Sequence, residues 1–142
     1  MLRKILTGRR VVPVLLCIQI LPLVIFPFAS YSLDSQEWWL PAVLTVLTLI
    51  ALVQLLVRRT IAPWPWYLLS FAQGLNIISR MMMLLPHAAR NGEGTVEFNG
   101  VYVLIAAIAM ILSGLSIWYM ELPEVRQRVA IKATPKASPK AA

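Results

Sequence analysis

Residues 65–87, PWYLLSFAQGLNIISRMMMLLPH, are long and apolar enough to cross a bilayer, yet they carry one polar stripe. At about 100° per residue on a helix, the stripe falls within an arc of about 120°. It consists of Trp66, Ser70, Gln73, Asn76, Arg80 and His87. Because unpaired polar groups and charge are costly in hydrocarbon, the stripe should turn away from lipid. We therefore expect this helix to face other helices, a buried ligand or another subunit.

The composition around this stretch is typical of an integral membrane protein. Of 142 residues, 59% are hydrophobic and 13% are charged, whereas a soluble domain usually carries about 25% charge. The apolar residues gather in four blocks separated by short charged or Gly/Pro-rich breaks. The sequence therefore predicts an all-α integral membrane protein with four transmembrane helices and no soluble domain.

The predicted transmembrane domain covers residues 11–121, with spans at about 11–29, 40–57, 65–86 and 101–120. Residues 1–10 form a basic N-terminus and residues 122–142 a basic tail. In this tail we expect one or two surface turns before KATPKASPKAA, which has a disordered composition. The basic start and first apolar run also resemble a signal peptide. Since the run is longer than usual for such a peptide, we interpret it as a retained span.

Two prolines, Pro22 and Pro27, should kink the first span and free backbone carbonyls. Kinked spans depend on neighbouring groups to bind those carbonyls, and Gln19 is close enough in sequence to help. In the second span, Thr45 and Thr48 can bond back to their own helix. Turn signals at residues 91–92 and 99–100 bracket residues 95–98 and indicate a small hairpin between the third and fourth spans.

Basic residues predict the orientation of the four spans. The N-terminus has four, the connection between spans two and three has two and the C-terminus has five, against one, Arg90, on the other side. Both termini should therefore be cytoplasmic, in a multi-pass protein of the cell membrane, which we assign to a prokaryotic inner membrane. The net charge of +7 is explained by these segment ends and by anionic phospholipid, so we expect no nucleic-acid partner.

Arg80 is the charged residue inside a predicted span, and no Asp or Glu lies within any of the four. It should snorkel toward the outer surface, near Glu93 or Glu97, or pair with a lipid phosphate or a carboxylate of another protein. With Ser70, Gln73 and Asn76 it forms our candidate contact site for a partner or a lipid. The three uncharged residues could also hydrogen-bond a quinone carbonyl, although such residues more often join helices.

A second candidate site is for helix packing. In the fourth span, Ala109, Ser113 and Gly114 are small residues that allow another helix to approach closely.

We expect no catalytic, metal or cofactor site. The chain has one cysteine, Cys17, and one histidine, His87, so it cannot build a thiolate cluster or a bis-histidine haem site. The methionines at 81–83 point in three directions on a helix and cannot converge on one copper ion. Motifs for phosphate loops, nucleophiles or paired carboxylates are absent from the sequence, which disfavours an enzyme.

Two main functions remain after these exclusions, beside a weaker third, an assembly factor that leaves the finished complex. The first is a non-catalytic accessory subunit of a larger membrane complex. Small multi-pass subunits are common in respiratory and photosynthetic electron-transfer complexes, so we expect a complex of that kind. The alternative is a small oligomeric transporter or channel for an anionic or polar solute. Its site would be the stripe of Gln73, Asn76 and Arg80. The two halves of the chain lack the internal similarity of a repeat-built transporter.

Overall fold

The computed structural model describes residues 2–8, 10–25, 38–92, 95–98 and 100–133. Several features predicted from the sequence lie outside these residues: the end of the first span with Pro27, most of the connection between the first two predicted spans, Glu93, and the tail at 134–142. The described helices before the hairpin are α1 (Leu2–Leu6), α2 (Val11–Ile18), α3 (Leu21–Val24), α4 (Trp39–Leu52), which continues as the π-helix η3 (Val53–Val57), and α5 (Trp64–Ala88). Strands β1 (Ala89–Gly92) and β2 (Thr95–Phe98) follow, and then helices α6 (Gly100–Glu121) and α7 (Pro123–Ala133).

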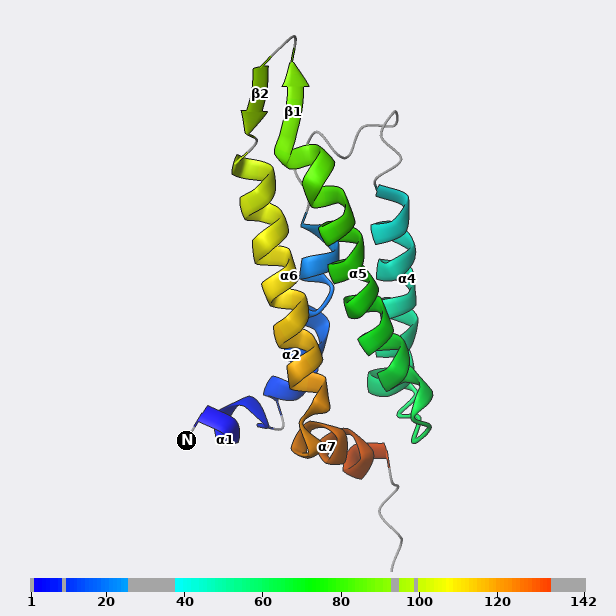
Figure 1. The fold of residues 1–142 in the computed structure, drawn as a ribbon. Coiled ribbons are helices and arrows are strands. Elements are labelled where there is room, and N and C mark those ends of the chain that lie inside the picture. Colours follow the sequence, from blue (N-terminus) through cyan, green and yellow to red (C-terminus); the bar gives the residue numbers. More distant parts are fainter. Residues whose placement is uncertain (1, 9, 26–37, 93–94, 99, 134–142) are drawn as a thin grey trace, which may run out of the picture.

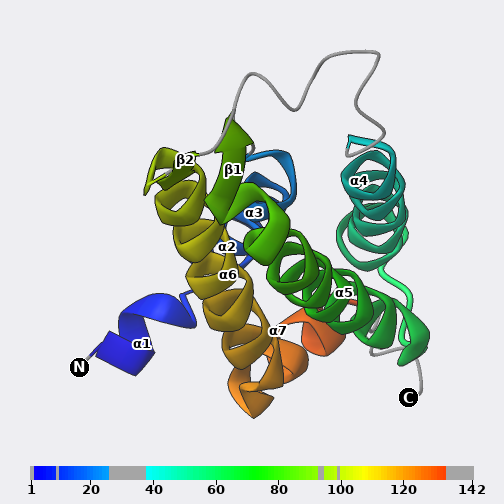
Figure 2. The same cartoon turned by 45° about the horizontal axis from the view of Figure 1, so that its top comes forward.

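Helix α5 is the central element, with α4 on one side and α6 on the other (Figures 1 and 2). The broken first helix, α2 and α3, packs between α4 and α6. The hairpin lies beyond α5 and α6 at one end of the bundle. Helices α1 and α7 lie at the opposite end (Figure 1). This arrangement turns the polar stripe of α5 toward the first helix.

Within the described residues, two helices are long and apolar enough to cross a membrane: Trp39–Val57, formed by α4 and η3, and Gly100–Glu121, which is α6. The apolar segment Val11–Val24 is shorter, and it is broken between α2 and α3. Helix α5 is continuous over 25 residues, but the polar stripe interrupts its apolar sequence. The described chain is thus a helical bundle that is compatible with membrane insertion, and the bounds of its three longest helices agree within two residues with those predicted for the last three spans.

The buried apolar side chains of the described part of the chain form two clusters. The large cluster joins α2, α4, η3, α5, α6 and α7, and contains Val12, Leu16, Ala51, Leu52, Leu55, Trp66, Leu69, Tyr119, Met120, Leu122, Val125 and Val129. The small cluster lies closer to the hairpin end and contains Leu23, Leu44 and Ala72. Both include α5, which is why this helix organises the bundle.

A hairpin lies where the sequence predicted one, but Asn91 and Gly92, which were expected to form a turn, belong to strand β1 and pair with Val96 and Thr95. Strands β1 and β2 pair antiparallel, with Ala89 opposite Phe98 and Gly92 opposite Thr95. The hairpin is a departure from a purely helical fold, and it is confined to the connection. It joins the ends of α5 and α6, the two helices with the most extensive mutual contact in the described chain.

Helix α7 differs from the surface turns expected in this part of the chain. Val125 is fully buried and Val129 is 6% exposed, and both belong to the large cluster. Arg126 fixes the start of the helix: its Nε donates to the Met120 carbonyl oxygen at 3.0 Å, and its guanidinium lies 5.9 Å from the Trp66 ring centroid. Residues 122–133 are therefore part of the folded bundle.

Candidate functional site: a buried polar network at the break of the first helix

The first helix is interrupted at Gln19 and Ile20, between α2 and α3. Pro22 has no N–H, so it cannot continue the α-helical ladder, and it occupies the first turn of α3, where this loss costs least. The N–H of Leu23 bonds to the carbonyl of Ile20 at 3.1 Å, so the carbonyl of Gln19 loses its usual partner four residues on. Breaking a helix inside an apolar bundle thus frees carbonyl oxygens that need donors.

Gln73 supplies the first donor from α5. Its Nε2 donates to the carbonyl oxygen of Gln19 at 2.8 Å, and the side chain is fully buried. This bond satisfies the acceptor left by the break. The side chain of Gln19, which sequence proximity suggested as a helper, is 2% exposed, and both of its amide atoms lack a hydrogen-bond partner.

Asn76, one turn further along α5, joins three groups. Its Nδ2 donates to the Pro22 carbonyl oxygen at 3.2 Å and to the Ser113 hydroxyl at 2.9 Å. Its Oδ1 accepts a 3.1 Å bond from Nε of Arg80. Asn76 and Ser113 are both fully buried. A single amide therefore ties α5 to α3 and to α6.

Arg80 completes the network. Its Nη2 donates to the carbonyl oxygens of Pro22 at 2.8 Å and Ile25 at 2.6 Å. These carbonyls end α3, where a positive charge is favourable because helix C-termini carry partial negative charge. Arg80 is 2% exposed. We expected it to snorkel outward or to bind a group outside the chain; instead it binds the backbone of the first helix.

The remaining predicted contact residues lie at the edges of this network. Ser70 is half-buried and makes none of these hydrogen bonds. Ala109 is fully buried in α6, as is Ser113, but Gly114 is exposed, with open space where a Cβ would stand. Of the three predicted packing residues, Ala109 and Ser113 therefore lie at the helix contact and Gly114 does not. His87 is in the last turn of α5.

The groups of this site are suited to holding helices together by hydrogen bonds. Its donors are neutral amides and a guanidinium, and the acceptors named above are backbone carbonyls, a hydroxyl and an amide oxygen. Among the described residues, none of the His, Cys, Asp and Glu side chains form a group of three that could hold a metal ion. The network therefore orders the broken helix against α5 and α6.

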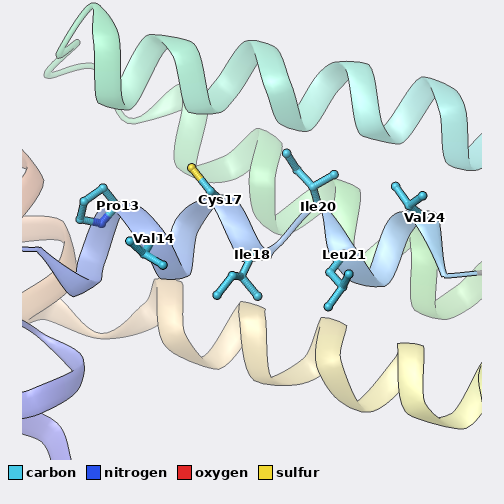
Figure 3. Close-up of a pocket in the computed structure, with 7 residues that line it drawn as sticks. All are labelled: Pro13, Val14, Cys17, Ile18, Ile20, Leu21 and Val24. Carbon is cyan, nitrogen blue, oxygen red and sulfur yellow. The ribbon is translucent and has the colours of Figure 1, made fainter.

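The outer face of the broken helix is hollowed. A depression of about 670 Å³ lies along α2 and α3, and Figure 3 shows Cys17, Ile20 and Val24 on the α4 side of the first helix and Ile18 and Leu21 on its α6 side. The lining is apolar apart from one thiol, that of Cys17, which is exposed. It consists of Pro13, Val14, Cys17, Ile18, Ile20, Leu21 and Val24. This hollow lies on the opposite face of the first helix from the polar network.

Sequence reasoning identified the donors of the site and missed its acceptors. The polar stripe on α5 and the kink at Pro22 were both evident, but the carbonyls at Gln19, Pro22 and Ile25 carry no residue signature. One sequence signal could have linked the donors to their acceptors. A proline inside one predicted span frees backbone carbonyls, and amide and guanidinium side chains at helical spacing on another span can donate to them.

Comparisons of this chain with protein-family models, with curated protein sequences and with solved structures give no match.

Proposed function

We propose that this chain is a non-catalytic structural subunit of a larger membrane assembly, with four spans and both termini in the cytoplasm. The observation that supports it most is the use of the polar stripe. Gln73, Asn76 and Arg80 are at most 2% exposed, and each donates to a backbone carbonyl of the chain's own first helix. Polar side chains that bond to the chain's own backbone stabilise its fold, as a structural subunit requires.

The arrangement of the ends supports the proposed orientation. Helices α1 and α7 lie at the same end of the bundle, opposite the hairpin (Figure 1). Lys4, Arg10, Arg58 and Arg128 are exposed on the elements at that end. A basic rim at one end suits the cytoplasmic, anionic face of a cell membrane, which makes phospholipid a second partner. We assign the protein to a prokaryotic inner membrane on the same grounds.

The partner surface in this proposal differs from the one that the sequence suggested. Because the polar stripe is buried within the chain, a neighbouring subunit would contact apolar surface. We place a transmembrane helix of that subunit in the hollow over α2 and α3 (Figure 3), where Cys17 is exposed. Small multi-pass subunits are common in respiratory and photosynthetic electron-transfer complexes, and we place the chain in such a complex on that base rate alone.

The transporter interpretation receives less support from the geometry. An anion site at Arg80 would need the guanidinium to face a pathway. Its Nη2 instead binds two carbonyl oxygens at 2.6 and 2.8 Å, within the bundle. A transporter also commonly uses ionisable relays inside its spans, and no Asp or Glu lies within the predicted spans.

Purification of the tagged chain from its native membranes in mild detergent tests the proposal. We expect a set of membrane proteins in fixed ratio to the chain, identified by mass spectrometry, and absent when an unrelated tagged multi-pass protein is purified in the same way. Purification of the chain alone, together with uptake of an anion by vesicles that contain only this protein, would favour the transporter.

A further inference from the structure

An open groove of about 260 Å³ lies between the first helix and α6. Two polar side chains contribute to it, but the Ser116 hydroxyl bonds to its own helix at the Leu112 carbonyl, 2.8 Å away, and the Gln19 amide atoms are buried. The rest of the groove is apolar or aromatic, and we call it the α6 groove. Its main lining residues are Leu15, Ile18, Leu112, Leu115, Trp118 and Tyr119.

The dimensions of the α6 groove distinguish between possible occupants. From Leu112 to Tyr119 the groove extends about 10 Å along the axis of α6. A helix of 10 Å diameter takes about 800 Å³ over that length, about three times the volume of the groove, so a partner helix could lie over the groove but could not enter it. A single hydrocarbon chain is narrower and flexible, and it is the neighbour that a bilayer supplies at this depth.

Helix α1 is held at one end of the groove. It lies beside the end of α6 that leads into α7 (Figures 1 and 2). The Tyr119 hydroxyl donates to the Leu6 carbonyl oxygen at 2.9 Å, which ties α1 to α6, and Leu6 also lines the groove. The chain then turns into α2 at Gly8, whose carbonyl accepts bonds from the N–H groups of Val11 and Val12 at 3.0 and 3.1 Å.

The two sides of α1 differ in polarity. Leu6 lines the groove, whereas Lys4, about 160° around the helix from it, is exposed. A helix with its apolar side in the acyl region and its basic side among the headgroups is typical of a membrane interface. Trp118, half exposed at the same end of the groove, is a residue enriched at that level. The headgroup of a lipid whose chain occupies the groove would therefore lie near Lys4.

The charge at this end of the groove is positive. Residues 1–33 include four basic residues and no Asp or Glu. On α6, Glu121 lies about 160° around the helix from Tyr119 and is paired with Arg126 at 3.4 Å. The mouth of the groove is therefore complementary to an anionic headgroup, and less so to a zwitterionic one.

We propose that the α6 groove binds an acyl chain of an anionic phospholipid whose phosphate group lies at Lys4. The inference rests on the proposed insertion of the chain into a membrane, and it is independent of the assembly in which the chain works. It assigns a site to the phospholipid partner, on the α6 side of the first helix, whereas Cys17 lies on the α4 side.

Photolabelling of the full chain in phosphatidylcholine vesicles tests the site. The probe is phosphatidylglycerol with a diazirine on one acyl chain, and phosphatidylcholine with the same diazirine is the reference. One lysine near a membrane surface favours the anionic lipid about fivefold, so the phosphatidylglycerol probe should label Ile18 at least fivefold more than the reference does. Leu104 is exposed on α6 about 16 Å nearer the hairpin than Leu115, and both probes should label it equally.

Two pairs of variants separate the headgroup contact from the chain contact. Lys4→Gln should lower the ratio of the two probes at Ile18 about fivefold. Arg58→Gln removes the same charge from the end of η3, beyond α5, and should leave the ratio unchanged. Leu115→Trp should fill the groove and reduce labelling of Ile18 by both probes, whereas Leu104→Trp should not. Leu115 and Leu104 are 55% and 61% exposed, so both changes should leave the fold intact.

Equal labelling of Ile18 by the two probes, or equal effects of Lys4→Gln and Arg58→Gln, would overturn the proposal. Labelling of Leu104 without labelling of Ile18 would also overturn it and would indicate that a second copy of the chain covers the groove. These outcomes leave the proposed membrane insertion intact. Absence of labelling from both positions would contradict the insertion itself.

Discussion

The guanidinium of Arg80 donates a 2.6 Å hydrogen bond to the carbonyl oxygen of Ile25, 55 residues earlier in the chain. The same nitrogen binds the Pro22 carbonyl oxygen at 2.8 Å. A charge that would be costly in hydrocarbon is thereby placed at the C-terminal end of a short helix, where it satisfies acceptors freed by the broken backbone.

Removing this charge should destabilise the bundle. Arg80→Leu leaves the Ile25 carbonyl without this donor, so we expect the free energy of unfolding to fall by about 1 to 3 kcal/mol. The stability of Arg80→Lys should lie between that of the unaltered chain and that of Arg80→Leu. The lysine ammonium keeps the positive charge but lacks the planar, forked donors of the guanidinium. Thermal unfolding in detergent measures the change, and Arg128→Leu on the exposed face of α7 is the control. Equal Tm values for Arg80→Leu and Arg128→Leu would refute the structural role.

The bond between Asn76 and Ser113 should couple α5 to α6. Asn76 Nδ2 donates to Ser113 Oγ at 2.9 Å. A double-mutant cycle with Asn76→Ala and Ser113→Ala should give a coupling energy of about 0.6 kcal/mol and at most about 1.7 kcal/mol. Ser116 bonds to its own helix at the Leu112 carbonyl, so the cycle with Ser116→Ala should give a value near zero. Equal coupling for the two serines would be inconsistent with the observed bond.

The three longest helices could be predicted from the sequence because each is a long, mostly apolar run with an aromatic or charged end. The bounds of α4 with η3, α5 and α6 agree with the predicted spans within two residues. The kink at Pro22 was also predictable, since proline acts locally. The hairpin was predicted only in outline, because Asn91 and Gly92, read as a turn signal, lie in strand β1.

The partners of the polar stripe could not be predicted in the same way. Arg80 binds carbonyl oxygens, and every residue has one, so the sequence contains no complementary residue to find.

The packing of α7 was missed for a related reason. Its buried face consists of Val125 and Val129 in a polar segment, and only their contact with the large cluster distinguishes them from residues of a surface turn.

Helix α7 should contribute to stability, which a loose tail would not do. Val125→Ala removes buried apolar surface from the large cluster, and we expect a loss of about 1 to 3 kcal/mol. Gln127→Ala, at an exposed position of the same helix, should change little. Thermal unfolding of the two variants compares them. If Val125→Ala unfolds at the same temperature as Gln127→Ala, α7 does not pack as described.

The orientation of the four proposed spans is tested by cysteine labelling in intact cells after Cys17 has been replaced. A cysteine introduced at position 93, in the connection between β1 and β2, should react with an impermeant maleimide from outside. One introduced at position 136 should react only after the cells are opened, because the basic ends retain the termini in the cytoplasm. Labelling of position 136 from outside would reverse the orientation.

Whether the chain works as a subunit is tested most directly by photo-cross-linking from Cys17 in native membranes. Cys17 is the one cysteine in the sequence and is exposed in the hollow over the first helix. A thiol-directed photo-cross-linker should give one discrete adduct with another membrane protein, identified by mass spectrometry and absent from the Cys17→Ser chain. Adducts with lipid alone, from a chain that also purifies without partners, would contradict the proposal that it is a subunit of a larger assembly.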